Sequence, residues 1–166
     1  MTKSDMIKVL VADDHAVVRQ GIKQILSKTP DLSVVDEAEN GNEVLVKVKA
    51  CAPDVVVMDI EMPVKIGWEV LPQLKSLYPK LPIIILSIHS EDMYGIRFLK
   101  AGASAYLTKA GAPDQLVQAI RKVAGGGKFI SPEMAERLVD ELGKDSDKSP
   151  HETLSPREFQ VFWSIA

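Results

Sequence analysis

Short apolar runs alternate with segments of helical period along most of the chain. Three of these runs, residues 7–12, 55–59 and 83–87, are largely apolar and rich in β-branched side chains at consecutive positions. A strand needs this pattern when it is buried on both faces, as in parallel sheets that helices cover. Weaker strands are predicted at 32–38 and 104–108, nearer the sheet edges.

Helices are predicted between these strands, because apolar residues recur there at intervals of three and four. The predicted helices span residues 15–28, 41–51, 67–78, 91–101 and 113–124. Pro72 is expected in the first turn of its helix, where its missing N–H costs little. The regular alternation of strand and helix predicts an α/β fold with an open, doubly wound sheet.

A further helix is predicted after this alternating unit. Ser131 and Pro132 are typical of an N-cap and a first helical residue, so we expect a helix at about 131–142. Gly143 is the residue expected to end it. The polar residues 144–153 then predict a linker.

The last residues, 154–166, predict the start of another amphipathic helix. Ser155 followed by Glu158 has the spacing of a capping box. This helix reaches the last residue with aromatic side chains that need cover. We therefore interpret it as the first helix of a truncated second domain.

Composition and charge narrow the class of protein. Hydrophobic content is 46% and charged content is 26%, as in soluble globular proteins, and the net charge of -3 does not favour a nucleic-acid surface. Cys51 is the only cysteine, which excludes an internal disulfide and fits a reducing compartment. Apolar runs are too short to cross a bilayer, and the N-terminus has no signal-peptide layout. A cytoplasmic protein without a membrane partner is therefore expected.

Polar side chains follow the predicted strands. The first strand leads to Asp13 and Asp14, the third ends in Asp59, the fourth ends in Ser87, and Lys109 follows the fifth. Doubly wound sheets bind their ligands beyond this carboxyl edge, where the strand order reverses. We therefore expect three carboxylates, a hydroxyl and an ammonium in one crevice.

Three carboxylates in one crevice repel each other unless some are protonated or a cation lies among them. All-oxygen ligands favour a hard ion, and Mg²⁺ is the hard ion that suits such a site best. The hydroxyl and the ammonium could then hold the anionic oxygens of a phosphoryl group. Asp59 is the best candidate nucleophile, because a carboxylate can form an acyl phosphate.

Four motifs in order carry a resemblance to a known family: VADDH, VVVMDIEMP, LSIHS and AYLTK. With them, the chain resembles bacterial two-component response regulators of the NarL/FixJ branch, which carry a LuxR-type helix-turn-helix domain. The resemblance implies a receiver domain at 5–125, a five-stranded, parallel, flavodoxin-like (βα)5 fold with strand order 2-1-3-4-5. It also implies a linker at 126–153 and the first helix of the DNA-binding domain at 154–166.

The resemblance implies a phosphoryl transfer to Asp59 from a sensor histidine kinase or from a small donor such as acetyl phosphate. Mg²⁺, for which Mn²⁺ can substitute, is expected on Asp14, Asp59 and the backbone carbonyl of Glu61, with Asp13 acting through water. Lys109 is expected to pair with another phosphoryl oxygen. The protein would catalyse only its own phosphorylation and dephosphorylation, so it is not expected to be an enzyme.

The resemblance also implies a conformational switch. Ser87 would move toward the phosphoryl group and Tyr106 would turn inward. In this branch the result is release of the DNA-binding domain and dimerisation on DNA, which this chain could bind only through the missing remainder of that domain. Glu61 and His89 occupy positions that tune the lifetime of the phosphoryl group. His15 is interpreted as a loop histidine rather than a metal ligand.

Two positions depart from the family pattern. Ile66 precedes Gly67 where Asp or Asn is common, so the third helix is expected to lack a usual cap. Ala112 stands where Ser or Thr often caps the fifth helix, at a cost of about 1 kcal/mol.

Three other functions fit parts of the pattern. Haloacid-dehalogenase phosphatases also use an Asp nucleophile and Mg²⁺, but they need a second Asp two residues on, where this chain has Glu61. A receiver-like interaction module without phosphorylation would not need the complete acidic set. A stand-alone phosphate sink would not need the helix predicted after Ser155.

Overall fold

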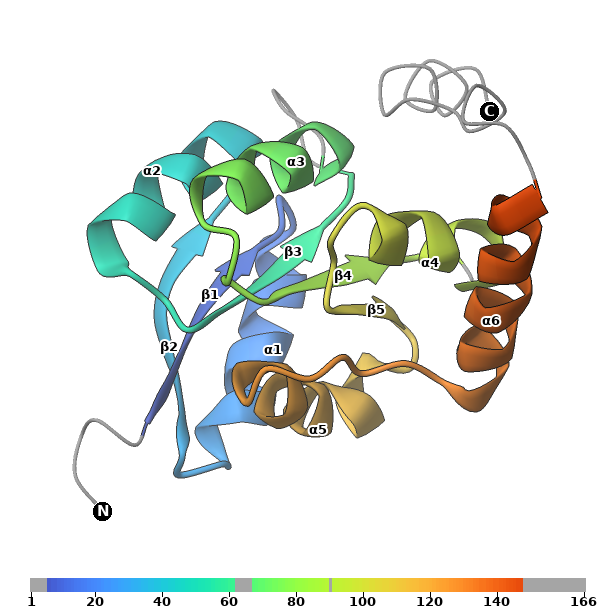
Figure 1. Ribbon diagram of the computed structural model, residues 1–166. Coiled ribbons are helices and arrows are strands. Elements are labelled where there is room, and N and C mark those ends of the chain that lie inside the picture. The colour runs from blue at the N-terminus through green and yellow to red at the C-terminus, as the bar shows by residue number, and fades with distance from the viewer. Residues whose placement is uncertain (1–5, 62–66, 90, 148–166) are drawn as a thin grey trace. The chain divides into compact units, whose positions relative to one another are not determined.

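The central sheet has the predicted topology. A computed structural model describes residues 6–61, 67–89 and 91–147 (Figure 1). The strands are β1 (Ile7–Ala12), β2 (Leu32–Ala38), β3 (Val55–Asp59), β4 (Ile83–Ser87) and β5 (Ala105–Thr108). Neighbouring strands pair in parallel in the order β2-β1-β3-β4-β5, which confirms the expected flavodoxin-like arrangement.

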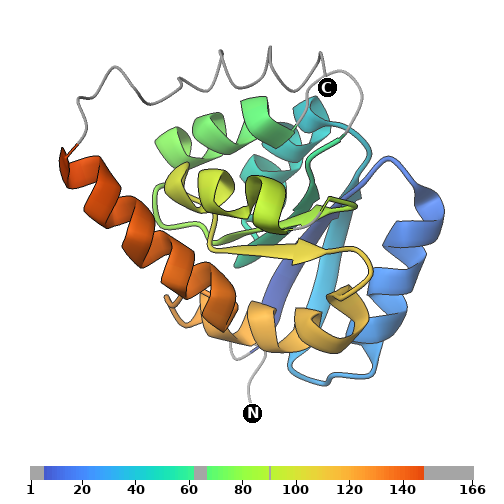
Figure 2. The same cartoon turned by 90° about the vertical axis from the view of Figure 1, so that its right-hand side faces the viewer.

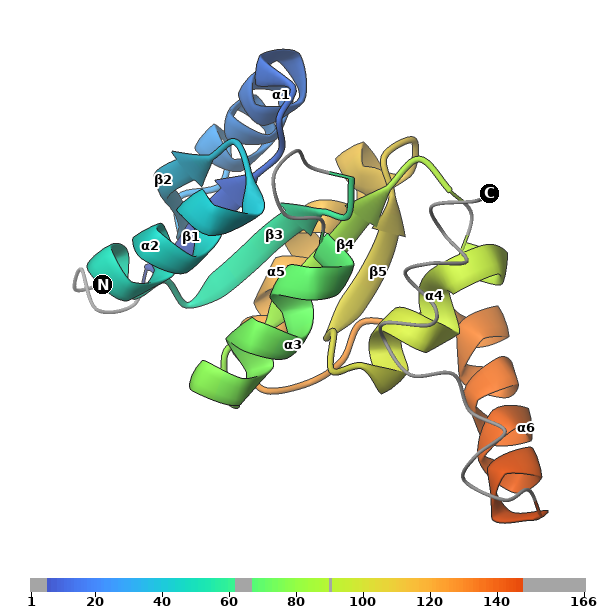
Figure 3. The same ribbon diagram turned by 90° about the horizontal axis from the view of Figure 1, so that it is seen from above.

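Five helices cover the two faces of this sheet. They are α1 (Ala16–Ser27), α2 (Gly41–Cys51), α3 (Gly67–Leu77), α4 (Glu91–Lys100) and α5 (Ala112–Ala124). Helices α1 and α5 lie on one face, and α2, α3 and α4 lie on the other (Figures 1 and 3). Figure 2 shows α1, in blue, beside α5, in orange, with which it is in contact. The strands are therefore covered on both sides, as their apolar runs predict.

The core explains why the strands tolerate so few polar residues. Every residue of β3 and β4 is buried. On the α1/α5 face, Val57 and Ile84 belong to one apolar cluster with Leu26 and Ile120. Burying a side chain of this kind contributes about 1.5–3 kcal/mol relative to leaving it exposed. The buried polar residues among those described are Asp13, Asp59 and Ser87, which all lie at the carboxyl ends of strands.

The strand order places the crevice between β1 and β3. The chain passes from β1 to β2 on one side, and then enters β3 on the other side of β1. The connections after β1 and β3 consequently lead to helices on opposite faces, α1 and α3 (Figure 3). Ligand crevices in doubly wound sheets open at this reversal. Asp13 and Asp59 lie there.

Two details of the helices that cover the sheet differ from the sequence-based expectations. Helix α5 begins at Ala112, and its N-cap is Gly111, so Ala112 is the first helical residue and not the cap. Pro72 is the sixth residue of α3, beyond the first turn. Its ring removes one backbone donor from the helix interior. The Ile66 departure lies outside the described residues.

A second compact unit begins at Ile130, after the unit that contains the sheet and ends at Phe129. Its helix α6 (Pro132–Asp147) starts as predicted, with the Ser131 Oγ accepting a hydrogen bond from the Met134 N–H at 3.0 Å. The expected stop at Gly143 is wrong, because the helix continues to Asp147. A glycine inside a helix costs only about 1 kcal/mol relative to alanine, which need not end it. The rest of the predicted linker and residues 154–166 lie outside the described residues.

Candidate functional site

The acidic residues of β1 and β3 meet at the carboxyl edge of the sheet. Asp13 is fully buried and Asp59 nearly so, whereas Asp14 is exposed. Asp13, Asp14, Asp59 and His15 each direct one donor atom into a volume where these atoms lie within 4.8 Å of one another. The crevice therefore concentrates negative charge as predicted.

Lys109, from the loop after β5, reaches both buried carboxylates. Its Nζ is 3.0 Å from Asp13 Oδ2 and donates a hydrogen bond to Asp59 Oδ2 at 3.2 Å. Its backbone N–H donates to the Ser87 carbonyl at 2.8 Å, which fixes this loop against the end of β4. Burial alone would lower the pKa of Lys109, but the carboxylates of Asp13 and Asp59 raise it. The side chain is therefore a cation at neutral pH.

One ammonium does not balance the charge of this crevice. Burial, followed by repulsion from Asp13, raises the pKa of Asp59 to about 6, although the Glu61 N–H and Lys109 act in the opposite direction. Asp13 Oδ2 is buried, and among the described residues no donor makes a hydrogen bond to it. Its ion-pair partner is the Lys109 ammonium, which Asp59 shares, so one positive charge serves two buried carboxylates. The donor set thus fits a hard divalent ion.

The loops after β3 and β4 are bridged beside Asp59. The Glu61 N–H donates to Asp59 Oδ1 at 3.2 Å, and the Glu61 carboxylate is 2.9 Å from His89 Nε2. The His89 N–H donates to Ser87 Oγ at 3.0 Å, and the Tyr106 hydroxyl donates to the His89 carbonyl at 3.1 Å. Ser87 and Tyr106 are both buried. His89 thus connects the three other side chains of this bridge.

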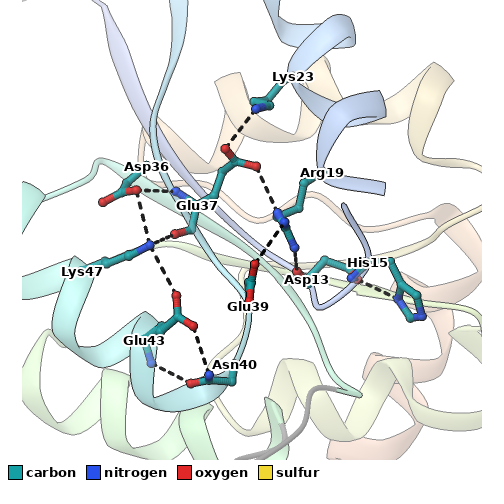
Figure 4. A network of polar contacts seen from close by, with 10 residues as sticks. All are labelled: Asp13, His15, Arg19, Lys23, Asp36, Glu37, Glu39, Asn40, Glu43 and Lys47. Atoms are coloured by element: carbon teal, nitrogen blue, oxygen red, sulfur yellow. Dashed lines mark hydrogen bonds and ion pairs between the residues drawn. The ribbon is translucent and has the colours of Figure 1, made fainter. Parts of the chain in front are cut away.

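A second charged cluster, formed by Arg19, Lys23 and Glu37, contacts the loop after β1 (Figure 4). The Arg19 guanidinium donates to the Asp13 carbonyl at 2.6 Å and to Glu37 Oε1 at 3.0 Å, and its side chain is only 12% exposed. Lys23 is 2.9 Å from the other Glu37 oxygen. The hydrogen bond from Lys23, with further help from Arg19 against burial, lowers the pKa of Glu37. The Glu37 carboxylate therefore has two cations beside it, Arg19 and Lys23.

His15 is closer to the carboxylates than the sequence analysis expected. It is the N-cap of α1, but its side chain makes no capping hydrogen bond. Instead, its Nδ1 lies 3.0 Å from both Asp13 Oδ1 and Asp14 Oδ1. Residues 15, 19 and 23 follow one another at helical intervals of four, so one face of α1 carries His15, Arg19 and Lys23 toward the acidic groups. That spacing was the available signal for Arg19, which sequence reasoning missed.

The five predicted side chains are thus gathered at one edge of the sheet. Asp13, Asp14 and Asp59 are grouped directly, Lys109 contacts two of them, and Ser87 pairs with Thr108 one residue before that lysine. An α/β sheet with an acidic, lysine-containing crevice at its switch point has the charged groups that binding of a cation and a phosphoryl group requires.

Comparison with known proteins identifies the family. Residues 9–121 match the response regulator receiver domain. The chain is 42% identical over 156 residues to the response regulator GacA of Pseudomonas protegens, covering 94% of this chain and 73% of that protein. It is 35% identical over 161 residues to the response regulator UvrY of Escherichia coli K12, covering 96% and 74%.

Solved structures agree with this relation. A LuxR-family two-component response regulator from Aurantimonas sp. SI85-9A1 superposes with a TM-score of 0.74 at 31% identity, over 82% of this chain and 97% of that chain. The isolated receiver domain of RcsB from Salmonella enterica serovar Typhimurium, solved with the phosphomimetic BeF3-, superposes with a TM-score of 0.71 at 28% identity, over 80% and 98%.

The chain therefore belongs to the response regulator receiver family. It is a response regulator of two-component signal transduction, a class that histidine kinases phosphorylate and that controls transcription. Among the helices that the structure describes, none has the length and apolar character needed to cross a membrane.

Proposed function

We propose that Asp59 accepts the phosphoryl group and that its modification switches the output of the protein. The main support for this proposal is the position of the Asp59 carboxylate. It is buried at the end of β3, and its two oxygens are held separately, Oδ2 by Lys109 and Oδ1 by the Glu61 N–H. A carboxylate fixed in this way is oriented for in-line attack, and orientation supplies much of the catalysis in phosphoryl transfer.

The transfer needs little covalent chemistry from the protein. A carboxylate oxygen of Asp59 forms a bond to phosphorus while the P–N bond to the histidine of the kinase breaks, and the electron pair of that bond remains on the imidazole. With acetyl phosphate, acetate leaves instead. The Lys109 ammonium, already 3.2 Å from Asp59, is placed to pair with an oxygen of the transferring group. In the slow dephosphorylation, water attacks the phosphorus and the Asp59 carboxylate is the leaving group. We expect the same residues to take part in this reaction.

Asp14, Asp59 and the Glu61 carbonyl would hold Mg²⁺, or Mn²⁺ in its place, and Asp13 would act through a water molecule. The unbalanced charge of the crevice and the buried Asp13 oxygen without a hydrogen bond support this assignment. When bound, the ion supplies positive charge that neutralises the phosphoryl oxygens.

Ser87 and Tyr106 form the proposed switch. Ser87 Oγ accepts a hydrogen bond from the His89 N–H, so its own proton can be donated to a phosphoryl oxygen. The Tyr106 ring is buried, and its hydroxyl is bonded to the His89 carbonyl. Tyr106 is therefore inward in this structure, as we expect it to be in the phosphorylated protein. Phosphorylation would then favour this inward arrangement over an outward one.

The histidine kinase is proposed to dock on the outer face of α1, beside the site. The proposed surface lies near Val17, Gln20 and Gly21. Val17 is 84% exposed there, Gln20 is exposed as well, and Gly21 is half-buried. An exposed valine on a helix that begins at the acidic loop suits a transient protein contact. A Val17→Glu, Gln20→Arg variant should accept phosphate from acetyl phosphate normally but from its kinase slowly. Further along the pathway, we propose transcriptional control through a DNA-binding domain and dimerisation on DNA.

Intact mass after incubation with acetyl phosphate tests the proposal most directly. We expect one phosphoryl adduct on the wild-type protein with Mg²⁺, and none on Asp59→Asn or when the metal is chelated. Because no kinase is present, such an adduct would also show that the protein catalyses its own phosphorylation from acetyl phosphate. An adduct of equal yield on Asp59→Asn, or a folded wild-type protein that takes up neither phosphate nor beryllofluoride, contradicts the proposal.

A further inference from the structure

We infer that His15 is a nitrogen ligand that gives the cation site a preference for borderline divalent ions, such as Co²⁺ and Zn²⁺, over Mg²⁺. The inference rests on the cation site of the proposed function and adds a residue to it. The relevant observation is that an imidazole nitrogen lies among the carboxylate oxygens, which the sequence did not lead us to expect.

The spacing of the donor atoms suits ligands of one ion. His15 Nδ1 is 3.0 Å from Asp14 Oδ1, which belongs to a proposed direct ligand, and 3.0 Å from Asp13 Oδ1. Two ligands at right angles around an ion with bonds of about 2.1 Å are separated by roughly 3.0 Å. The imidazole therefore lies where a neighbouring ligand would lie, and it needs no large movement to coordinate.

The backbone holds the ring in this position. The His15 N–H donates to Asp13 Oδ1 at 2.8 Å, which ties the N-cap residue of α1 to the buried carboxylate. The side chain is 64% exposed and is not used as a helix cap, so coordination breaks no packing or capping contact. Asp13 and Asp59 are both buried in this crevice and share the one ammonium of Lys109, so their two carboxylates leave room for further positive charge there.

The ligand set predicts the selectivity. Mg²⁺ takes oxygen ligands and keeps several waters, so it gains little from an imidazole. Co²⁺ and Zn²⁺ bind imidazole well and exceed Mg²⁺ in affinity for mixed nitrogen and oxygen sites. The simpler interpretation is that the ring only donates a hydrogen bond to Asp13 Oδ1. The two interpretations differ in how substitution of His15 changes the ratio of the metal affinities.

Isothermal titration of the whole chain with Mg²⁺ and with Co²⁺ separates these interpretations, with the Co²⁺ visible spectrum as a second readout. Wild type is compared with His15→Ala and with His15→Asn, because asparagine is a good N-cap and protects the fold of α1. His151→Ala is the matched control, since it removes an imidazole from the residues outside the described structure and measures non-specific binding to histidine.

We expect wild type to bind Co²⁺ at least about tenfold more tightly than Mg²⁺, and both His15 variants to lose about tenfold or more of the Co²⁺ affinity, with Mg²⁺ affinity within about twofold of wild type. The Co²⁺ spectrum should change in the His15 variants and not in His151→Ala. An unchanged affinity ratio in His15→Asn overturns the inference and leaves the Mg²⁺ site intact. Failure of wild type to bind either ion overturns the cation site of the proposed function as well.

Discussion

Two clusters of charged residues meet at Asp13, and they differ in how their charges are matched. On the crevice side, Asp13 and Asp59 share the single ammonium of Lys109. On the other side, Glu37 is held by both Arg19 and Lys23. Both clusters contain ion pairs of about 3 Å, so the distances alone do not separate a functional site from a structural one.

The pKa values do separate them. Burial and Asp13 raise the pKa of Asp59 to about 6, whereas hydrogen bonds from Lys23 and Arg19 lower the pKa of Glu37. The matched cluster is complete without a ligand and stabilises the loop after β1. The unmatched cluster has a deficit of positive charge, which is the condition for holding a cation and a phosphoryl group. An excess of buried charge is therefore the feature that distinguishes the site.

Substitution of Lys109 in one cluster and of Lys23 in the other should give the largest difference in the rate of phosphorylation. Lys109→Met removes the ammonium that pairs with Asp59, so we expect phosphorylation by acetyl phosphate to slow by about 100-fold or more. Lys23→Met is the matched control, because it removes an equivalent charge from the other cluster, and it should leave the rate within about twofold of wild type. The measurement is the initial rate of adduct formation by mass spectrometry. Equal rates for the two variants would remove the distinction between the clusters.

Arg19→Met should act mainly on stability. Its guanidinium donates to the Asp13 carbonyl and to Glu37 from a largely buried position. Loss of such charged hydrogen bonds should lower the free energy of unfolding by about 2 kcal/mol, measured by urea denaturation. Mg²⁺ affinity should also weaken, because the backbone that carries Asp13 and Asp14 is less constrained without this contact.

Arg19→Lys is the control for charge alone. It keeps the cation but loses the planar fork that contacts the carbonyl and the carboxylate together. We expect it to recover only part of the stability. Full recovery of both stability and Mg²⁺ affinity would mean that Arg19 acts only as a charge and does not position the loop.

Asp59→Asn should change stability in the opposite direction. The pKa of Asp59 rises from 3.8 to about 6 on folding, so between these values the folded state keeps a proton that the unfolded state has lost. The free energy of unfolding therefore falls as pH rises through this window, by about 2 kcal/mol after allowance for partial solvent access. Asparagine does not titrate. The variant should match wild type near pH 4 and exceed it above pH 6, by urea denaturation in chelator. A pH-independent difference contradicts the raised pKa of Asp59.

Much of the fold could be predicted from the sequence, because the β-branched runs at 55–59 and 83–87 allow few other structures. The candidate site residues could be predicted for a related reason. Asp59 and Ser87 end strands and Lys109 follows one, and the carboxyl ends of parallel strands meet at one edge of the sheet. The expected helix stop at Gly143 was wrong because a single glycine is a weak signal.

The contacts around the site could not be predicted in the same way. Glu61 and His89 are 28 residues apart in the chain, on loops whose path no periodicity describes. The family resemblance implies that both positions tune the lifetime of the phosphoryl group, but it does not indicate that the two side chains touch. The approach of His15 to the carboxylates likewise depends on its side-chain rotamer at the start of α1, which helical spacing does not determine.

The smallest predicted effect concerns Glu61 and His89, whose side chains are 2.9 Å apart beside the unmatched cluster. The pair joins the loops after β3 and β4 next to Asp59, and we propose that it limits access of the attacking water. Glu61→Ala and His89→Ala should each speed dephosphorylation by several-fold, less than about 1.4 kcal/mol in the barrier. If the pair acts as one bridge, the double variant should be no faster than either single one. Decay of the adduct, followed by mass spectrometry after removal of acetyl phosphate, gives the rates. Unchanged decay in both single variants would show that the bridge has no part in hydrolysis, and additive effects would show that the two side chains act separately.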